Sequence, residues 1–391
     1  MMNRKLIDKV KSKISELSDH STLLVRAPGR INLIGEHTDY NKGFVLPAAI
    51  DLGIYFAFSL SNDSTCRVIA LDEGESLDFT LDELEPLAGF SWKNYVLGVV
   101  SRLKSQGYGI EPFNIVFTGD LPQGSGLSSS AALECGVCFG LNELFHLDLS
   151  RREMALTAQW SEHHFVGVMC GIMDQYASLF GVEDHAILLD CDSLNHEVSP
   201  IKLSDHKFLL INSEVKHSHA SSGYNVRREQ TEEGVEIIAR TYTAVRSMRD
   251  MHIEILENCK SSLSDKSYRR CKYIIEENER VHGIVEAMKS DDLGRVGELL
   301  KQGQEGMKNG YEITCEEIDF LADFANDYQG VLGARMMGGG FGGCTINLIE
   351  RSIEDQFVSD IGEAYKKEFD INSTPISVEI SDGVHIISES N

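Results

Sequence analysis

Residues 27–47, APGRINLIGEHTDYNKGFVLP, are the most informative stretch of this chain of 391 residues. The apolar run at 23–25 leads into it and has the character of a buried strand. Four polar side chains then follow within a short distance, and they are Arg30, Glu36, His37 and Asp39. Such a concentration of polar groups beside a predicted core strand indicates side chains that contact a ligand.

The composition is that of an ordinary globular protein, with 42% hydrophobic and 25% charged residues. The formal net charge is −25, and a field of this sign repels nucleic acids and anionic membranes. We therefore expect neither of them as a partner. The same field opposes the phosphates of a nucleotide, so local groups would have to hold them.

The length suits two domains, because domains usually contain about 100–200 residues. Strand patterns dominate residues 21–120, whereas helical spacing with charged outer faces dominates residues 225–330. Short strands and one further helix end the chain. We predict an α+β protein with two lobes, domains 1–200 and 201–391, and a boundary near residues 195–205.

The nine cysteines are scattered, and their number is odd, which indicates reduced thiols rather than a disulfide framework. The closest pair, Cys135 and Cys138, lies in a helical pattern and shares one face, so we expect it to pack in the core. The polar N-terminal segment lacks the apolar core of a signal peptide. These features predict a cytoplasmic protein.

The apolar run at residues 44–60 approaches the length of a membrane span. Pro47, Asp51 and Gly53 interrupt it, and a span needs about 20 predominantly apolar residues. We expect two buried strands joined by a turn.

A second cluster, LPQGSGLSSSAALE at 121–134, follows a predicted strand. Gly124 and Gly126 free the backbone, and the serines 128–130 open a predicted helix, where serine is a good N-cap. Unpaired N–H groups at a helix start bind phosphates without Lys or Arg, and a serine hydroxyl could also ligate Mg²⁺. A capped flexible loop is the structural alternative. The chain has no Gly-Lys-Ser/Thr step, so a Walker P-loop is excluded.

The third cluster, MMGGGFGGCTINLI at 336–349, formally matches the G-x-G-x-x-G pattern. A dinucleotide-binding loop requires a strand before the glycines and a helix after them. Here a helix-like stretch precedes the glycines and a strand follows, which argues against an NAD-dependent dehydrogenase. We predict a loop whose backbone closely approaches either a ligand or the second cluster.

The fourth stretch, CGIMDQYASLFG at 170–181, places Asp174 among apolar residues. Such a carboxylate is either a paired structural group or a functional one. Glu162 lies twelve residues upstream, and we expect it to share the neighbourhood of Asp174. His163 and His164 point to different faces of a helix, so we do not predict a metal site from them.

The order of these clusters resembles that of the GHMP kinases, and RINLIGEHTDYNKG resembles the signature of the galactokinase family. CGIMDQ and SSGYNVRRE at 221–229 also match that family, so the resemblance covers nearly the whole chain. It implies a two-lobed fold with a mixed-sheet N-terminal domain, a helix-rich α/β sandwich as C-terminal domain, and the active site between them. It also implies a monomer that uses ATP and Mg²⁺ to phosphorylate the C1 hydroxyl of α-D-galactose, the first committed step of galactose catabolism.

The resemblance assigns roles residue by residue. Asp174 would face the anomeric hydroxyl, with Arg30 beside it. The sugar contacts would be Glu36, His37, Thr38, Asp39, Gly171 and Tyr224. The ATP phosphates would lie on Gly124, Ser125, Gly126, Leu127, Ser128, Ser129 and Ser130, and Mg²⁺ on Ser130 and Glu162. The chain departs from the family pattern at Ser161, where Ala is commoner, and at Gly223, where Glu is more usual.

Two other functions remain open from the sequence. The first is a kinase for a related sugar, such as N-acetylgalactosamine, arabinose or a uronic acid, although Thr38 resembles the galactokinases rather than the N-acetylgalactosamine kinases. The second is a non-catalytic, sugar-sensing regulator, against which Arg30, Asp174 and the intact serines 128–130 argue. Trp92 and Tyr95 either border the adenine or pack in the core.

Overall fold

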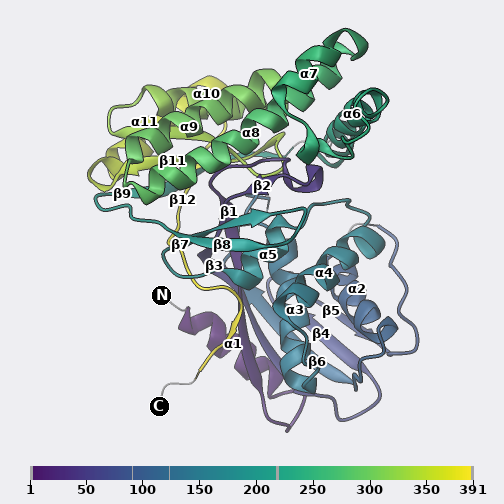
Figure 1. The fold of residues 1–391 in the computed structure, drawn as a ribbon. Coiled ribbons are helices and arrows are strands. Elements are labelled where there is room, and N and C mark those ends of the chain that lie inside the picture. The colour runs from purple at the N-terminus through teal and green to yellow at the C-terminus, as the bar shows by residue number, and fades with distance from the viewer. Residues whose placement is uncertain (1–2, 90, 123, 217–219, 389–391) are drawn as a thin grey trace.

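The computed structural model describes residues 3–89, 91–122, 124–216 and 220–388, which form two lobes (Figure 1). Within these residues, the first lobe is built on a sheet of six strands in the order β13-β1-β3-β6-β4-β5. Neighbouring strands are antiparallel except β4 and β6, so the sheet is mixed, as predicted. Its strands are β1 (Leu23–Asn32), β3 (Pro47–Leu60), β4 (Cys66–Ala70), β5 (Glu75–Phe79), β6 (Phe113–Gly119) and β13 (His385–Ile386).

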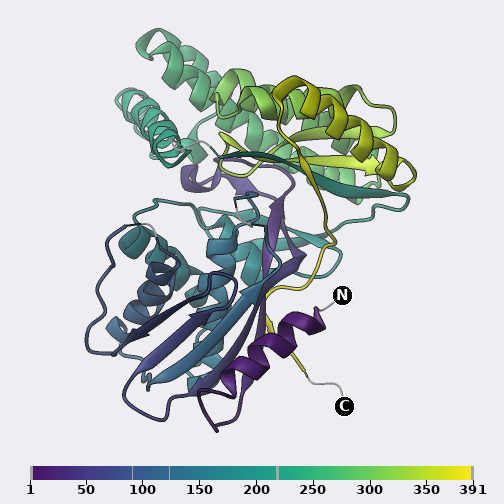
Figure 2. The same cartoon turned by 180° about the vertical axis from the view of Figure 1, so that it is seen from behind.

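Helices cover both faces of this sheet. The helices α2 (Trp92–Ser105), α3 (Ser129–Phe145), α4 (Arg151–Ser161) and α5 (Met173–Phe180) lie on one face. The helix α1 (Arg4–Ile14) lies on the other, where Leu6, Val10 and Ile14 bury one side of it against β3 and β6 (Figure 2). Cys135 and Cys138 are buried in α3, which confirms their predicted place in the core.

Residues 44–60 differ from the prediction. The break falls at Leu46, between β2 (Phe44–Val45) and β3, and the chain passes Asp51 and Gly53 without turning. Pairing with β1 on one side and β6 on the other holds β3 extended over its whole length. The strand β2 belongs to a small sheet with β7 (His185–Asp190) and β8 (His196–Pro200). Among the described residues, no helix is long and apolar enough to cross a membrane.

The second lobe is a sheet covered by helices. In the described chain this sheet has four strands in the order β10-β11-β9-β12. They are β9 (His206–Lys216), β10 (Val331–Met337), β11 (Gly342–Glu350) and β12 (Thr374–Ser377). The helices are α6 (Ala220–Ala239), α7 (Ile253–Cys259), α8 (Asp265–Lys289), α9 (Leu293–Glu305), α10 (Glu316–Asp327) and α11 (Glu354–Phe369).

Short helical turns complete the described chain. The 3₁₀ turns are η1 (Asp39–Asn41), η3 (Met248–Asp250), η4 (Lys260–Ser262) and η6 (Arg351–Ile353). The π-helical turns are η2 (Glu162–Val166), which continues α4, and η5 (Gly306–Tyr311), which continues α9.

The expectation of a helix before the third glycine cluster is wrong, because residues 331–337 form strand β10. Leu, Ala, Arg and Met favour helices, but backbone pairing with β11 overrides that local preference. The glycines therefore form the turn of a β-hairpin, in which Met337 pairs with Cys344. Since a strand and not a helix follows them, the dinucleotide-binding reading stays excluded.

The two lobes share part of their core. One buried apolar cluster contains Ile31 and Leu46 from the first lobe together with Phe208 and Val281 from the second. The chain also returns to the first lobe at its end, where β13 pairs with β1. The boundary near residue 200 stays a prediction, but residues 385–386 lie on the sheet of the first lobe.

Candidate active site

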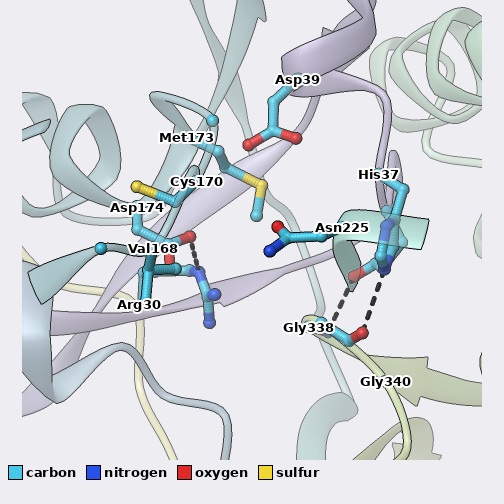
Figure 3. Close-up of a pocket in the computed structure, with 14 residues that line it drawn as sticks. Arg30, His37, Asp39, Val168, Cys170, Met173, Asp174, Asn225, Gly338 and Gly340 are labelled. Carbon is cyan, nitrogen blue, oxygen red and sulfur yellow. Dashed lines mark hydrogen bonds and ion pairs between the residues drawn. The ribbon is translucent and has the colours of Figure 1, made fainter. Parts of the chain in front are cut away.

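Two cavities meet between the predicted clusters. The smaller one has a volume of about 260 Å³ and contains Glu36, His37 and Asp39 in its lining (Figure 3). The larger one has a volume of about 860 Å³ and is lined by the Gly/Ser loop. Arg30, Asp174 and Gly339 line both cavities, so a group bound in one lies beside a group bound in the other at these residues.

Arg30 and Asp174 form an ion pair at this junction. Strand β1 carries Arg30, whose Nε donates to Asp174 Oδ1 over 2.7 Å, and the Asp174 side chain is 31% exposed. The Ser128 hydroxyl donates to Asp174 Oδ2 over 2.5 Å. Arg30 also donates through Nη1 to the Gly126 carbonyl. The carboxylate is thus held on both oxygens yet remains open to the cavities.

The Gly/Ser loop forms one wall of the larger cavity. Gly124 and Gly126 have φ values of 72° and 75°, a left-handed conformation that glycine adopts easily. Helix α3 begins at Ser129, and its first N–H groups have no partner within the helix. These features agree with the predicted phosphate cradle, and all the predicted positions Gly124, Ser125, Gly126, Leu127, Ser128, Ser129 and Ser130 line the cavity.

Ser128 differs from the expectation of a helix N-cap. Its φ is 59°, and its side chain makes no capping hydrogen bond, because the hydroxyl points to Asp174 instead. A left-handed serine is uncommon and is held there by its surroundings. Ser128 therefore links the phosphate loop to the carboxylate at the junction.

Ser130 and Glu162 lie together, as predicted for a metal site, and the Ser130 hydroxyl hydrogen-bonds Glu162. Burial raises the pKa of Glu162 to about 7, with the charge of Asp174 adding to the effect and the Ser130 hydrogen bond opposing it. A buried carboxylate beside a hydroxyl fits Mg²⁺, which binds few protein oxygens and takes further ligands from phosphates and water. His163 and His164 instead hydrogen-bond the carbonyls of Cys170 and Trp160, over 2.9 Å each.

Asp39 and Gly171 face each other in the smaller cavity. The Tyr40 backbone N–H donates to Asp39 Oδ1 over 2.9 Å. A Cβ atom on Gly171 would lie 1.8 Å from Asp39 Oδ2, so only glycine leaves the carboxylate in place. Desolvation, and then the charge of Asp174, raise the pKa of Asp39 to about 6. Both residues were predicted to bind the sugar, and both line the pocket.

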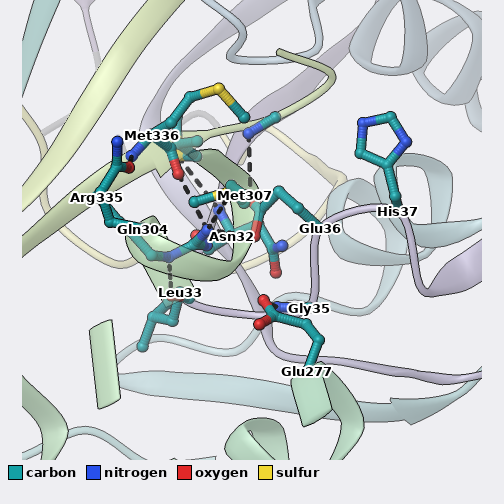
Figure 4. A network of polar contacts seen from close by, with 12 residues as sticks. Asn32, Leu33, Gly35, Glu36, His37, Glu277, Gln304, Met307, Arg335 and Met336 are labelled. Atoms are coloured by element: carbon teal, nitrogen blue, oxygen red, sulfur yellow. Dashed lines mark hydrogen bonds and ion pairs between the residues drawn. The ribbon is translucent and has the colours of Figure 1, made fainter. Parts of the chain in front are cut away.

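Glu36 joins the two lobes through a buried ion pair with Arg335 (Figure 4). Its Oε1 accepts the Gly338 N–H over 3.1 Å, and Arg335 donates to the carbonyls of Leu33 and Asn32 over 2.8 Å each. Glu36 lines the smaller cavity, and its predicted contact with a sugar hydroxyl stays a prediction. Sequence analysis missed Arg335, because the stretch around it has helical composition.

His37 also connects the lobes. Burial lowers its pKa to about 4, so the ring is neutral at physiological pH. Its Nε2–H donates to the Gly339 carbonyl over 3.0 Å, and Nδ1 accepts from the Tyr40 hydroxyl over 2.7 Å. Both nitrogens are therefore engaged by protein groups. His37 lines the pocket, and the predicted direct hydrogen bond to the sugar stays a prediction.

Thr38 requires a correction. Its side chain is fully buried, and its hydroxyl lies 2.8 Å from the Gly35 carbonyl and 2.6 Å from the Phe44 carbonyl. It is not among the described residues that line the smaller cavity. Backbone carbonyls in the tight turn compete successfully for the hydroxyl, so Thr38 shapes the loop rather than facing the ligand.

Tyr224 belongs to helix α6, but its side chain lies outside the part that the structure describes, so its contact with the sugar stays a prediction. Asn225, the next residue, lines the smaller cavity and faces Asp39 (Figure 3). Sequence analysis missed Asn225, Cys170 and Met173 as lining residues, whereas the glycines 338–340 belong to the loop that was expected to approach either a ligand or the second cluster closely. Cys170 and Met173 flank Gly171 and Asp174 in CGIMDQ, and that proximity was a usable signal.

The question of Trp92 and Tyr95 resolves toward the larger cavity. Both residues line it together with Phe117. The Trp92 indole N–H donates to Glu75 Oε2 over 3.3 Å, and Tyr95 also belongs to the core of the first lobe. Aromatic side chains in the lining of this cavity suit the flat base of a nucleotide.

Three family models match the chain. They are described as GHMP kinases N terminal domain, over residues 94–182, galactokinase galactose-binding signature, over residues 15–60, and GHMP kinases C terminal, over residues 284–367. Crystallised mevalonate kinases share the fold, one with a TM-score of 0.65 at 19% identity, covering 92% of this chain and 99% of that one. Fold and site thus define a kinase of the GHMP class.

Individual relatives narrow this class. A galactokinase of Thermotoga petrophila is 40% identical over 363 residues, which span 93% of this chain and 99% of that protein. A galactokinase of Clostridium perfringens is 40% identical over 90% of this chain and 92% of its own. The crystal structure of Lactococcus lactis galactokinase complexed with galactose has a TM-score of 0.92 at 33% identity, covering 98% and 99% of the two chains. The chain belongs to the galactokinase family.

Proposed function

We propose that this protein transfers the γ-phosphoryl group of ATP to the C1 hydroxyl of α-D-galactose. One observation carries the proposal: a sugar-sized cavity and a nucleotide-sized cavity meet at the Arg30–Asp174 ion pair. Relatives that share about two fifths of its sequence bear the name galactokinase, and the Lactococcus lactis enzyme was crystallised with galactose. The reaction is the first committed step of galactose catabolism.

Asp174 accepts the proton of the C1 hydroxyl, or holds that hydroxyl in position, while the hydroxyl oxygen of the sugar attacks the γ-phosphorus. The new O1–Pγ bond forms as the bond from Pγ to the β,γ-bridging oxygen breaks, and ADP leaves. Arg30 stands beside the transferred group and stabilises its charge, which is the main requirement of phosphoryl transfer. Ser128 keeps the Asp174 carboxylate aligned through its short hydrogen bond.

The nucleotide lies in the larger cavity, with its phosphates on the backbone N–H groups of residues 124–130. These groups need no cationic side chain, which suits a chain with a net charge of −25. Ser130 and Glu162 would hold Mg²⁺, which when bound neutralises phosphate charge. Trp92 and Tyr95 border the base.

The sugar lies in the smaller cavity. Asp39 offers a carboxylate oxygen to sugar hydroxyls, Asn225 offers an amide, and the Glu36–Arg335 pair fixes the wall between the lobes. We also propose that the enzyme acts as a monomer, as the resemblance to the galactokinase family implies. The reduced cysteines of the sequence support a cytoplasmic location.

The test is a panel of free sugars incubated with MgATP, in which ADP release is followed and the product is identified by mass. We expect galactose to react and its phosphate to sit on C1, as shown by the loss of reducing activity. If the enzyme prefers N-acetylgalactosamine to galactose, then N-acetylgalactosamine is its substrate instead. Sugar binding without turnover would indicate the sugar-sensing alternative and contradict the proposal. Asp174→Asn serves as the matched inactive control.

A further inference from the structure

A third cavity lies in the second lobe, and helices α8 and α9 and the π-helical turn η5 supply most of its lining. Its volume is about 860 Å³, similar to that of the nucleotide cavity. Its described lining shares no residue with either cavity of the active site. A cavity of this size accommodates a metabolite.

The lining of the groove holds more cationic than acidic side chains, although Arg269, Lys272 and Arg295 each pair with a carboxylate. Its described lining includes five cationic side chains, which are Arg269, Lys272, Arg280, Arg295 and Lys301. It includes three acidic side chains, which are Glu276, Glu279 and Glu305. The lining therefore carries an excess of two positive charges, whereas the whole chain carries −25. Clustered cations in a concave surface concentrate anions there.

Arg280 gives the groove a specific donor. The residue is only 8% exposed, and its Nε donates to Glu277 Oε2 over 2.7 Å. Within the described chain its buried Nη2 has no hydrogen-bond partner. A Cβ atom on Gly306 would lie 3.0 Å from this nitrogen, so the glycine backbone packs closely against the guanidinium on the groove wall. A buried unpaired donor on a guanidinium is costly and indicates a missing acceptor.

We propose that the α8–α9 groove binds a small phosphate ester, whose phosphate accepts from Arg280 Nη2. Guanidinium groups suit phosphate oxygens because their donors are charged and planar. Lys272 and Lys301 add charge at the rim, while the amides of Gln302 and Asn309 offer hydrogen bonds to the rest of the molecule.

The groove is connected to the sugar loop. Glu277, the partner of Arg280, accepts the Gly35 backbone N–H at Oε1 over 3.0 Å (Figure 4). Tyr273, which lines the groove, donates its hydroxyl to the Glu36 carbonyl over 3.1 Å. A phosphate on Arg280 Nη2 pulls the guanidinium away from Glu277, which accepts from Nε, and thereby loosens the turn that carries Glu36, His37 and Asp39. The ligand therefore weakens sugar binding, and this second part rests on the proposed galactose kinase function.

The binding test uses glycerol 3-phosphate and inorganic phosphate as probes in calorimetric titrations of the full-length protein. A non-hydrolysable MgATP analogue at saturation blocks the nucleotide cavity. We expect one equivalent of probe to bind, and Arg280→Gln to weaken binding by about tenfold or more. Tighter binding of the ester identifies the ester as the ligand, whereas equal affinities mean that the phosphate group carries the recognition.

Lys272→Gln keeps the test decisive if Arg280→Gln fails to fold, because the Lys272 side chain is 42% exposed and its loss spares the core. It should weaken the probe by about threefold, as expected for a charge near the surface. Lys366→Gln, on α11 outside the groove, is the matched control and should change nothing. No binding, or equal binding by all four proteins, overturns the proposed site.

The coupling test measures the KM for galactose and for ATP with and without glycerol 3-phosphate. We expect the galactose KM to rise in the wild type and to stay constant in Arg280→Gln, while the ATP KM stays constant in both. An unchanged galactose KM at saturating probe overturns the coupling. Because the titrations need no turnover, failure of the galactose kinase proposal leaves the result for the groove intact.

Discussion

The two halves of the active site are built in different ways. The nucleotide cavity is lined almost entirely by the first lobe, and Gly339 is the residue of its described lining that comes from the second lobe. The sugar pocket takes residues from both lobes, including Asp39 and Asp174 from the first and Asn225 and the glycines 338–340 from the second. One half is therefore a local structure, and the other depends on how the lobes pack.

This difference also separates the chemistry of the two halves. Backbone N–H groups at the start of α3 would hold the phosphates in the proposed function, and they are present whenever the helix forms. The sugar pocket relies on side chains that are held across the lobe junction, such as Glu36 with Gly338 and His37 with Gly339. Substitutions at the meeting point of the two cavities, where Arg30 and Asp174 lie, should affect turnover. Substitutions elsewhere in the sugar pocket should affect sugar binding selectively.

Asp174→Asn tests the meeting point and should have the largest effect. The change removes the proton acceptor, so kcat should fall by about 10²–10⁴-fold. ATP binding should survive, because the Gly/Ser loop is untouched. Turnover would be measured by ADP release and ATP affinity by titration. A kcat within tenfold of the wild type would rule out the assigned role of Asp174.

Asp39→Ala tests whether the halves are separate. Loss of a charged acceptor in the pocket should raise the galactose KM by about 10²-fold, with little change in the ATP KM. Gly171→Ala should act in the same direction, because its methyl group would displace the Asp39 carboxylate. Steady-state kinetics with each substrate varied in turn provides the measurement. Equal increases in both KM values would contradict the division.

Ser128→Ala probes the link between the halves. The hydroxyl aligns Asp174 over 2.5 Å and also lines the nucleotide cavity. Loss of a hydrogen bond to a carboxylate should lower kcat by about tenfold. Ser129→Ala is the matched control on the next residue, and its kcat should fall less. If both variants lose the same activity, the effect comes from the loop and not from Asp174.

Asp39→Asn tests the cost of the sugar pocket to stability, which is the smallest effect. The pKa of Asp39 rises from 3.8 to about 6 on folding, so the folded protein favours the protonated acid. Stability from this group is present at low pH, falls as the pH rises from about 4 through 6, and then stays level.

The difference between the two pKa values of Asp39 corresponds to a change in the free energy of unfolding of at most about 3 kcal/mol. Asp39→Asn should therefore raise the thermal midpoint at pH 7.5, and the gain should shrink as the pH falls toward 4. Thermal unfolding of both proteins across this range provides the measurement. A gain that does not change with pH would mean that ionisation of Asp39 is not its cause.

Much of the fold follows from the sequence where local and tertiary preferences agree. The strand expected before the second cluster and the helix expected to follow it are present as β6 and α3, because apolar periodicity acts locally. β10 and the continuous β3 were missed, since partner strands decided their conformation. The seven residues of β10 contain no pattern that shows that a partner strand pairs with them.

The sequence by itself pointed to the chemistry that we propose for this protein, through the helix start that would hold phosphates, the GEHTD loop, and the carboxylate in CGIMDQ. Those features depend on residue type and short spacing, so they can be read along the chain. Only the tertiary structure decided that Ser128 reaches Asp174, that Thr38 turns to backbone carbonyls, and that Arg335 pairs with Glu36. The Ser128 and Thr38 contacts form as the first lobe folds, whereas the Arg335–Glu36 pair joins distant parts of the chain and is created by the packing of the two lobes.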